Sequence, residues 1–193
     1  ISSVAEKFKR PICIITYNEM QAKQMVKDLR FFTDKIEYFG KKEIASYDYI
    51  AESKDLPYER IETLNQIIQK RTPIVVTTIE AIMQKIPSKA TLYKNRIELK
   101  IGKTYSLEEI KQKLVNLGYI RCDLIEGKGE FSVRGDILDI SLDDKIGIRI
   151  EFWGDEIDSI RKFAIASQRS INTLDKIEIN PAHEYILENS IED

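Results

Sequence analysis

GEFSVRGDILDI (residues 129–140) and GIRIEFWGDEIDSIRKF (residues 147–163) decide the fold, because polar and apolar side chains alternate along both runs. A period of two is typical of a β-strand with one buried and one exposed face. In the first run, Phe131 and Val133 share one predicted face, and Ser132 and Arg134 share the other. In the second run, the predicted inner face carries Ile146, Ile148, Ile150 and Phe152, and the outer face Gly147, Arg149, Glu151 and Trp153.

The outer face of the second run groups side chains of the kind that stabilise protein interfaces. Trp153 is the only tryptophan of the chain and shares its predicted face with Arg149 and Glu151. Exposed Trp and Arg dominate the hot spots of protein interfaces. The alternation alone leaves a second interpretation equally open, in which Arg149 and Glu151 form an exposed ion pair and Trp153 packs under a loop as core.

Glycines mark the places where these strands bend or end. Gly135 lies inside an apparent strand and is soon followed by two adjacent apolar residues, so a β-bulge is expected there. Gly154 and Asp155 predict a hairpin turn. The segment 156–163 is predicted to be the strand after that turn, although its three-residue apolar spacing also fits a helix.

One helix is predicted before these strands. Ser106 and Glu109 form a capping box, and Gly118 is suited to the left-handed position after the helix. The apolar stripe of this helix consists of Leu107, Ile110, Leu114 and Leu117. One helix against an antiparallel sheet predicts a small α+β domain.

The first part of the chain alternates strands and helices. PICIIT and PIVVTT are continuous apolar runs of the kind that parallel sheets bury on both faces. The expected order is a strand at 11–16, a helix at 18–32, short strands at 36–39 and 44–47, a helix after Pro57, a strand at 73–78 and a short helix at 79–85. We therefore predict an α/β fold, with a partial parallel-sheet lobe and an inserted small α+β domain.

Composition and motifs argue against several functions. The formal net charge is -2, so no global basic field favours DNA or an anionic membrane, and no apolar run is long enough for a membrane span. No GxxxxGK[ST] loop occurs, so we expect no nucleotide cofactor within these residues. His183 has no partner ligands in sequence, so neither a metal site nor a catalytic residue is expected. Cys13 and Cys122 predict reduced thiols in a cytoplasmic protein.

Four runs of the sequence together resemble a known family. They are residues 129–140, residues 149–161 (RIEFWGDEIDSIR), residues 167–170 (SQRS) and residues 181–184 (PAHE). In this order they are similar to the UvrB-homologous N-terminal module of the bacterial transcription-repair coupling factors (Mfd). The resemblance extends over most of the chain, with less specific matches before residue 95.

The resemblance implies a partner and a site. In this family the inserted domain docks onto UvrA, presenting two arginines and an aromatic residue. Arg134, Arg149 and Trp153 occupy those positions, and Glu151 is a weaker candidate. The family usually has Phe where this chain has Trp153, a larger aromatic that is expected to serve the same packing.

The resemblance also implies an organisation. Residues 1–94 would be a UvrB-like lobe that lacks its nucleotide loop, residues 95–180 the inserted UvrA-binding domain, and residues 181–193 the return to the lobe. The chain would be a fragment of a longer protein, a DNA translocase whose ATP- and Mg-dependent motor, RNA polymerase contacts and duplex DNA contacts lie elsewhere. We expect the fragment itself to be no enzyme.

A second function remains open, in which the chain is a DNA-handling lobe of a UvrB-type, nucleotide-dependent helicase-like protein. UvrB carries a long aromatic β-hairpin that clamps DNA, soon after a Tyr-Asp-Tyr-Tyr run. Here Tyr47-Asp48-Tyr49-Ile50 is followed only by the short polar stretch AESKD before the next predicted helix. The missing hairpin favours the coupling-factor interpretation.

Overall fold

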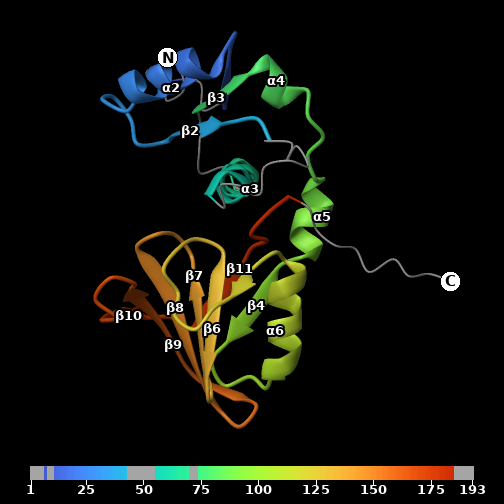
Figure 1. The fold of residues 1–193 in the computed structure, drawn as a ribbon, viewed down its shortest axis with the longest axis vertical. Helices are drawn as coiled ribbons and strands as arrows, with labels where there is room; N and C mark the ends of the chain where they lie inside the picture. Colours follow the sequence, from blue (N-terminus) through green and yellow to red (C-terminus); the bar gives the residue numbers. More distant parts are fainter. Residues whose placement is uncertain (1–6, 8–10, 43–54, 70–73, 185–193) are drawn as a thin grey trace, which may run out of the picture. The chain divides into compact units, whose positions relative to one another are not determined.

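The computed structural model describes residues 7, 11–42, 55–69 and 74–184. The chain divides into two compact units, unit 1 (Ile1–Lys89) and unit 2 (Ala90–Asp193), whose folds are shown in Figure 1. Together they confirm the predicted α/β class, with a parallel sheet in one unit and a mostly antiparallel sheet in the other. Within the described residues, no helix has the length and apolar character needed to cross a membrane.

Unit 1 is built on a three-stranded parallel sheet with the strand order β1-β3-β2. Its elements are β1 (Ile12–Thr16), α2 (Glu19–Leu29), β2 (Ile36–Phe39), α3 (Asp55–Ile68), β3 (Ile74–Thr78) and α4 (Ile79–Ile82). The strands predicted at 11–16 and at 73–78 are confirmed as β1 and β3. The strand predicted at 44–47 and the Tyr47–Ile50 stretch lie outside the described residues.

Helices α2 and α3 cover opposite faces of this sheet. Ala22 and Val26 of α2 pack on the face that carries Ile36 of β2. On the other face, the Arg60 guanidinium of α3 lies 4.1 Å from the ring centroid of Phe39. Helix α2 starts as predicted, because Asn18 Oδ1 accepts a hydrogen bond from the Gln21 amide at 2.9 Å.

Unit 2 contains a six-stranded sheet with the order β10-β9-β8-β7-β6-β5 and a separate β11-β4 pair (Figure 1). Only β5 is parallel to its neighbour in the larger sheet. The elements are α5 (Lys89–Lys94), β4 (Ile97–Lys100), α6 (Leu107–Asn116), β5 (Ile120–Arg121), β6 (Glu130–Arg134), β7 (Ile137–Ser141), β8 (Ile146–Trp153), β9 (Glu156–Ala164), β10 (Ser170–Thr173) and β11 (Lys176–Ile179). The predicted Ser106 cap is confirmed, since its hydroxyl accepts a hydrogen bond from the Glu109 amide.

The predicted bulge at Gly135 is wrong. Gly135 and Asp136 form a two-residue turn between β6 and β7, in which Arg134 pairs with Ile137. Gly135 has a φ of 58°, the left-handed value that glycine adopts at little cost at the first position of such a turn. A turn and a bulge both place a glycine next to a change in the apolar pattern, so the pattern did not separate them.

The predicted strand after Gly154 and Asp155 is confirmed as β9, and the bulge lies there instead. Glu151 pairs with Ser159 but Phe152 pairs with Ile157, so Asp158 is one extra residue in β9. The bulge brings Ile157 and Ile160 to the same inner face although they are three positions apart. This explains why the spacing of this strand resembled that of a helix.

Phe163 lies on the outer face of the sheet, opposite Gly147 of the neighbouring strand. There it packs with Ile125 and Ile165 in a small second core that covers one end of the face. Gly147 makes room for this ring, because a Cβ atom at residue 147 would lie 2.5 Å from Phe163 Cζ. The end of the outer face near Phe163 is therefore buried.

Gly147→Ala is expected to lower the free energy of unfolding of unit 2 by about 1–3 kcal/mol. Phe163 cannot move away easily, because it is fully buried and the Arg149 guanidinium lies over its ring. Urea denaturation followed by circular dichroism measures the effect. Gly127→Ala is the control, since no atom lies within 4 Å of a Cβ placed there; equal midpoints for the two variants would contradict the prediction.

The chain after β11 packs on the C-terminal end of α6. The Ala182 amide donates to the Leu117 carbonyl at 2.8 Å, and the Tyr119 hydroxyl donates to the Asn180 carbonyl at 3.0 Å. The His183 ring lies against Gly118, which has a φ of 88°. Burial lowers the pKa of His183 from its ordinary value of 6.5.

The imidazole of His183 is expected to titrate with a midpoint below 6.5. Because the unfolded chain binds this proton at a higher pH than the folded chain, unit 2 should lose stability as the pH falls below about 6.5. The chain has a single histidine, so one imidazole signal in a proton NMR titration reports the value. The urea-unfolded chain serves as the reference, and a folded midpoint at or above the unfolded one would refute the prediction.

Candidate protein-binding face of unit 2

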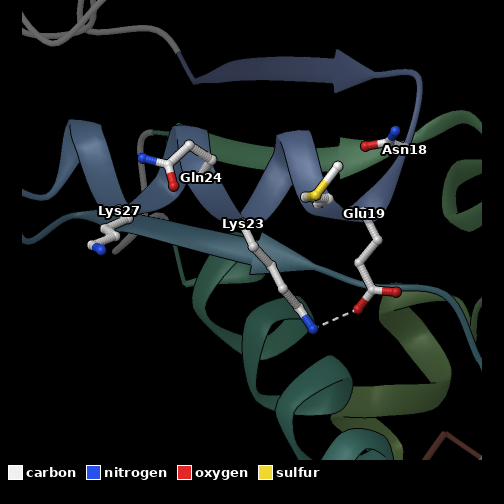
Figure 2. A pocket seen from close by; sticks show the side chains of 6 residues that line it. Asn18, Glu19, Lys23, Gln24 and Lys27 are labelled. Atoms are coloured by element: carbon white, nitrogen blue, oxygen red, sulfur yellow. Dashed lines mark ion pairs between the residues drawn. The ribbon is translucent and has the colours of Figure 1, made fainter.

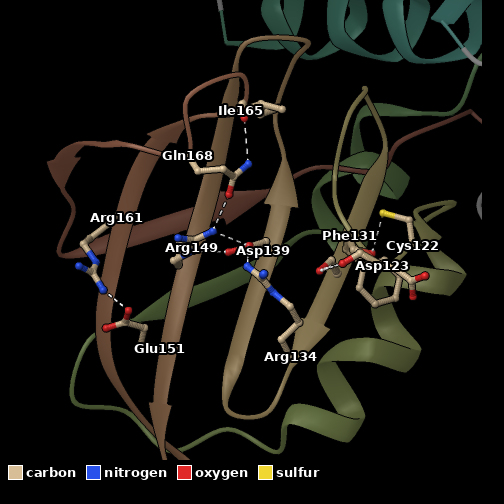
Figure 3. Close-up of polar contacts among 11 residues, drawn as sticks. Cys122, Asp123, Phe131, Arg134, Asp139, Arg149, Glu151, Arg161, Ile165 and Gln168 are labelled. Carbon is tan, nitrogen blue, oxygen red and sulfur yellow. Dashed lines mark hydrogen bonds and ion pairs between the residues drawn. The ribbon is translucent and has the colours of Figure 1, made fainter.

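The outer face of unit 2 is the side of β6–β9 that faces away from the core, and it brings the predicted site residues together. The strand register places on it Ser132, Arg134, Ile137, Asp139, Arg149, Glu151, Trp153, Ser159, Arg161 and Phe163. Figure 3 shows the polar contacts across this face. The four predicted residues come from the two strands on either side of β7, with Arg134 at the end of β6 and the other three along β8.

Arg149 is held on three sides. Its Nε donates to Asp139 Oδ1 at 2.8 Å, and its Nη2 donates to Asp139 Oδ2 at 2.8 Å and to Gln168 Oε1 at 2.9 Å. The guanidinium carbon lies 4.5 Å from the ring centroid of Phe163. The hydrogen bonds to Asp139 raise the pKa of Arg149, and its side chain is 18% exposed. Arg149 is therefore a protonated side chain whose guanidinium is held by three hydrogen bonds and a stacked ring.

Arg134 is held much more loosely by the same carboxylate. Its Nη2 lies 3.4 Å from Asp139 Oδ2, and its side chain is 54% exposed, whereas that of Asp139 is 2% exposed. A single long contact leaves most of the guanidinium donors of Arg134 facing solvent. Two cations thus share one buried anion, and this part of the outer face has a net positive charge.

The exposed ion-pair interpretation supposed that Glu151 pairs with Arg149, and the structure contradicts it. The Glu151 carboxylate pairs with Arg161 and accepts a hydrogen bond from the Ser159 hydroxyl at 2.9 Å. Both members of the Glu151–Arg161 pair are about one-third exposed, so the pair contributes little to stability. Glu151 is available at the surface with its charge largely compensated.

Trp153 is 85% exposed, which contradicts the interpretation that it belongs to the core. It is the last residue of β8, directly before the Gly154–Asp155 turn. The loop before α6 fixes this hairpin end: the Tyr105 amide donates to the Asp155 carbonyl at 2.7 Å, and Ile157 exchanges backbone hydrogen bonds with that loop. A large apolar ring is therefore held in water by a well-anchored backbone.

The outer face carries arginine and tryptophan side chains, the residue types that dominate the hot spots of protein interfaces. Its polar groups are guanidinium, carboxylate, amide and hydroxyl groups engaged with one another, and no group of three or more metal-binding side chains occurs in the described part of the chain. In unit 1, the side of α2 shown in Figure 2 is a hollow lined by Asn18, Glu19, Met20, Lys23, Gln24 and Lys27. Among the residues that line this hollow, Lys23 and Glu19 form an exposed ion pair at 2.6 Å. An exposed pair of this kind is common on helix surfaces and does not indicate a binding site.

A family model described as the UvrB interaction domain matches residues 97–185, which include the whole outer face. The chain contains a UvrB interaction domain. Over 189 residues it is 33% identical to the transcription-repair-coupling factor of Bacillus subtilis (strain 168), an alignment that covers 96% of this chain and 16% of that protein. With the corresponding protein of Staphylococcus aureus (strain bovine RF122 / ET3-1), it shares 31% identity over 192 residues, covering 97% of this chain and 16% of the relative.

The chain is thus homologous, over nearly its whole length, to a segment of transcription-repair-coupling factors, and it spans 16% of their length. The predicted resemblance is confirmed at this level. The match covers the domain as a whole and assigns a partner contact to no single residue. Arg134, Arg149, Glu151 and Trp153 therefore remain predicted contact residues.

Sequence reasoning missed the two polar residues that hold Arg149, which are Asp139 and Gln168. Asp139 could have been found from the hairpin register, because the outer-face position opposite Arg149 on the preceding strand is residue 139. Gln168 lies in the loop between β9 and β10, and the only signal was its place in the SQRS run. No pattern of local spacing connects it with Arg149.

Asp139→Asn is expected to lower the free energy of unfolding of unit 2 by on the order of 3 kcal/mol, because it leaves the largely buried Arg149 without its counter-charge. Asp136→Asn is the matched control, since the same chemical change falls on an exposed turn residue. Urea denaturation followed by circular dichroism compares the two. A loss no larger than that of the control would mean that Asp139 does not stabilise the domain.

Proposed function

We propose that the chain is a non-catalytic interaction module that binds UvrA through the outer face of its UvrB interaction domain. In this proposal the module belongs to a longer bacterial, cytoplasmic coupling factor and recruits nucleotide excision repair to stalled RNA polymerase. The observation that supports it most is the 85% exposure of Trp153 on an anchored hairpin, on the same face as Arg134 and Arg149.

The physical reason is that exposing a tryptophan to water is unfavourable unless a partner covers it. Covering this ring removes a large apolar area from water, at roughly 25 cal/mol per Å². Arg134 adds a guanidinium with open donors that can bind a carboxylate or backbone carbonyls of the partner. Arg149 adds a fixed positive charge, and Glu151 adds a carboxylate near the centre of the face.

Further parts of the proposal concern the longer protein. Its ATP- and Mg-dependent motor and its contacts with RNA polymerase and duplex DNA would lie outside these residues. The module would comprise a UvrB-like lobe (residues 1–94), the inserted domain (residues 95–180) and the return to the lobe (residues 181–193). These boundaries follow from the family resemblance.

The proposal predicts that the chain binds purified UvrA and that Trp153→Ala and Arg134→Ala each weaken binding by about 1–3 kcal/mol, roughly five- to 150-fold in Kd. Both side chains are exposed, so neither change should unfold the domain. Lys113→Ala on α6 is the matched control, because it removes an exposed side chain and a charge away from the strands of the outer face. Isothermal titration measures Kd, and circular dichroism confirms the fold of each variant.

Three outcomes would change the proposal. No binding by the wild-type chain would remove UvrA as the partner, and full binding by both folded variants would move the site away from the outer face. A mobility shift of short duplex DNA at physiological salt would favour the alternative of a DNA-handling lobe. ATP hydrolysis by the purified chain would contradict its non-catalytic role.

A further inference from the structure

Gln168 has an unusual backbone. Within the described part of the chain it is the only residue other than glycine with a φ in the left-handed region, at 56°. For a residue with a Cβ atom, this conformation costs on the order of 1 kcal/mol and persists only where other contacts hold it.

The side-chain amide of Gln168 bridges its own loop and the outer face. Its Nε2 donates to the Ile165 carbonyl at 2.9 Å, and its Oε1 accepts from Arg149 Nη2 at 2.9 Å. Figure 3 shows this chain of contacts from Ile165 through Gln168 to Arg149 and Asp139. The amide is oriented by the loop at one end, so its oxygen is aimed at the guanidinium at the other.

This contact completes the hydrogen bonding of one side of Arg149. A guanidinium has five N–H donors, of which Nε has one and each Nη has two. Asp139 accepts from Nε and from one hydrogen of Nη2, and Gln168 accepts the second hydrogen of Nη2. Among the contacts of the described residues, none uses Nη1, so its two N–H groups are the ones left for a partner.

We infer that Gln168 is a positioning residue of the proposed UvrA-binding face, which fixes the Arg149 guanidinium so that Nη1 is presented to the partner. This inference rests on the proposed function. Asp139 alone is a shared anchor, because the same Oδ2 atom also lies 3.4 Å from Arg134 Nη2. Gln168 gives Arg149 a second acceptor that Arg134 does not share.

The benefit is preorganisation. An arginine that is already fixed loses less conformational freedom when a partner binds it. The face of the guanidinium rests on Phe163, one edge is held by Asp139, and Gln168 closes the remaining position on Nη2. The strained backbone of Gln168 is the local cost of placing its amide oxygen there.

The first test does not need UvrA. NMR on the full, nitrogen-15-labelled chain measures rotation of the Arg149 guanidinium about its Nε–Cζ bond. Gln168→Gly, which tolerates the left-handed backbone, is expected to accelerate this rotation about two- to twelvefold, the effect of one lost hydrogen bond. Gln168→Glu loses the donor to the Ile165 carbonyl but keeps an acceptor for Nη2 and makes it a charged one, so in this variant the guanidinium should rotate no faster than in the wild type. Unchanged rotation in Gln168→Gly, or equally fast rotation in both variants, would overturn the inference.

The second test measures UvrA binding in a double-mutant cycle. Gln168→Gly should weaken binding about two- to twelvefold in the wild type and leave it unchanged in an Arg149→Lys background, because its effect passes through the guanidinium. Equal weakening in both backgrounds would show a loop effect and overturn the inference. If the wild-type chain does not bind UvrA at all, the proposed function fails, while the rotation measurement still decides whether Gln168 positions Arg149.

Discussion

A buried carboxylate that two arginines share is the constraint on which the outer face of unit 2 depends. Asp139 is 2% exposed, and a buried charge without partners would be very costly. Its partners reach it only because the turns of two hairpins set the strand register. A slip of one residue between β7 and β8 would send the carboxylate toward the core and the neighbouring isoleucine to the surface.

The same constraint explains how one sheet can serve two purposes. Toward the core, the strands present fully buried side chains such as Phe131, Leu138 and Ile150. On the outer face, one end is sealed by Phe163 and its neighbours, and the other end stays open around Trp153. The hydrogen bonds of Arg149 with Asp139 and Gln168 lie between these two ends. They separate the small core around Phe163 from the exposed ring of Trp153.

Much of this domain could be predicted from the sequence because its signals are local. The alternation along β8 assigned both faces of the strand correctly, and Ser106 and Gly118 marked the ends of α6. The failures came where the outcome depends on how two strands pair, or on a contact between a strand and a loop. Gly135 was mistaken for a bulge because the pairing of Arg134 with Ile137 is a property of two strands, and Gln168 reaches Arg149 across 19 positions.

The exposure of Trp153 also makes the domain suited to optical study. It is the only tryptophan of the chain, so all of the tryptophan fluorescence comes from one solvent-facing ring at the open end of the outer face. A molecule that covers the ring would move it to a less polar environment and shield it from soluble quenchers. The wild-type chain therefore carries its own reporter of occupancy at this face, without any label.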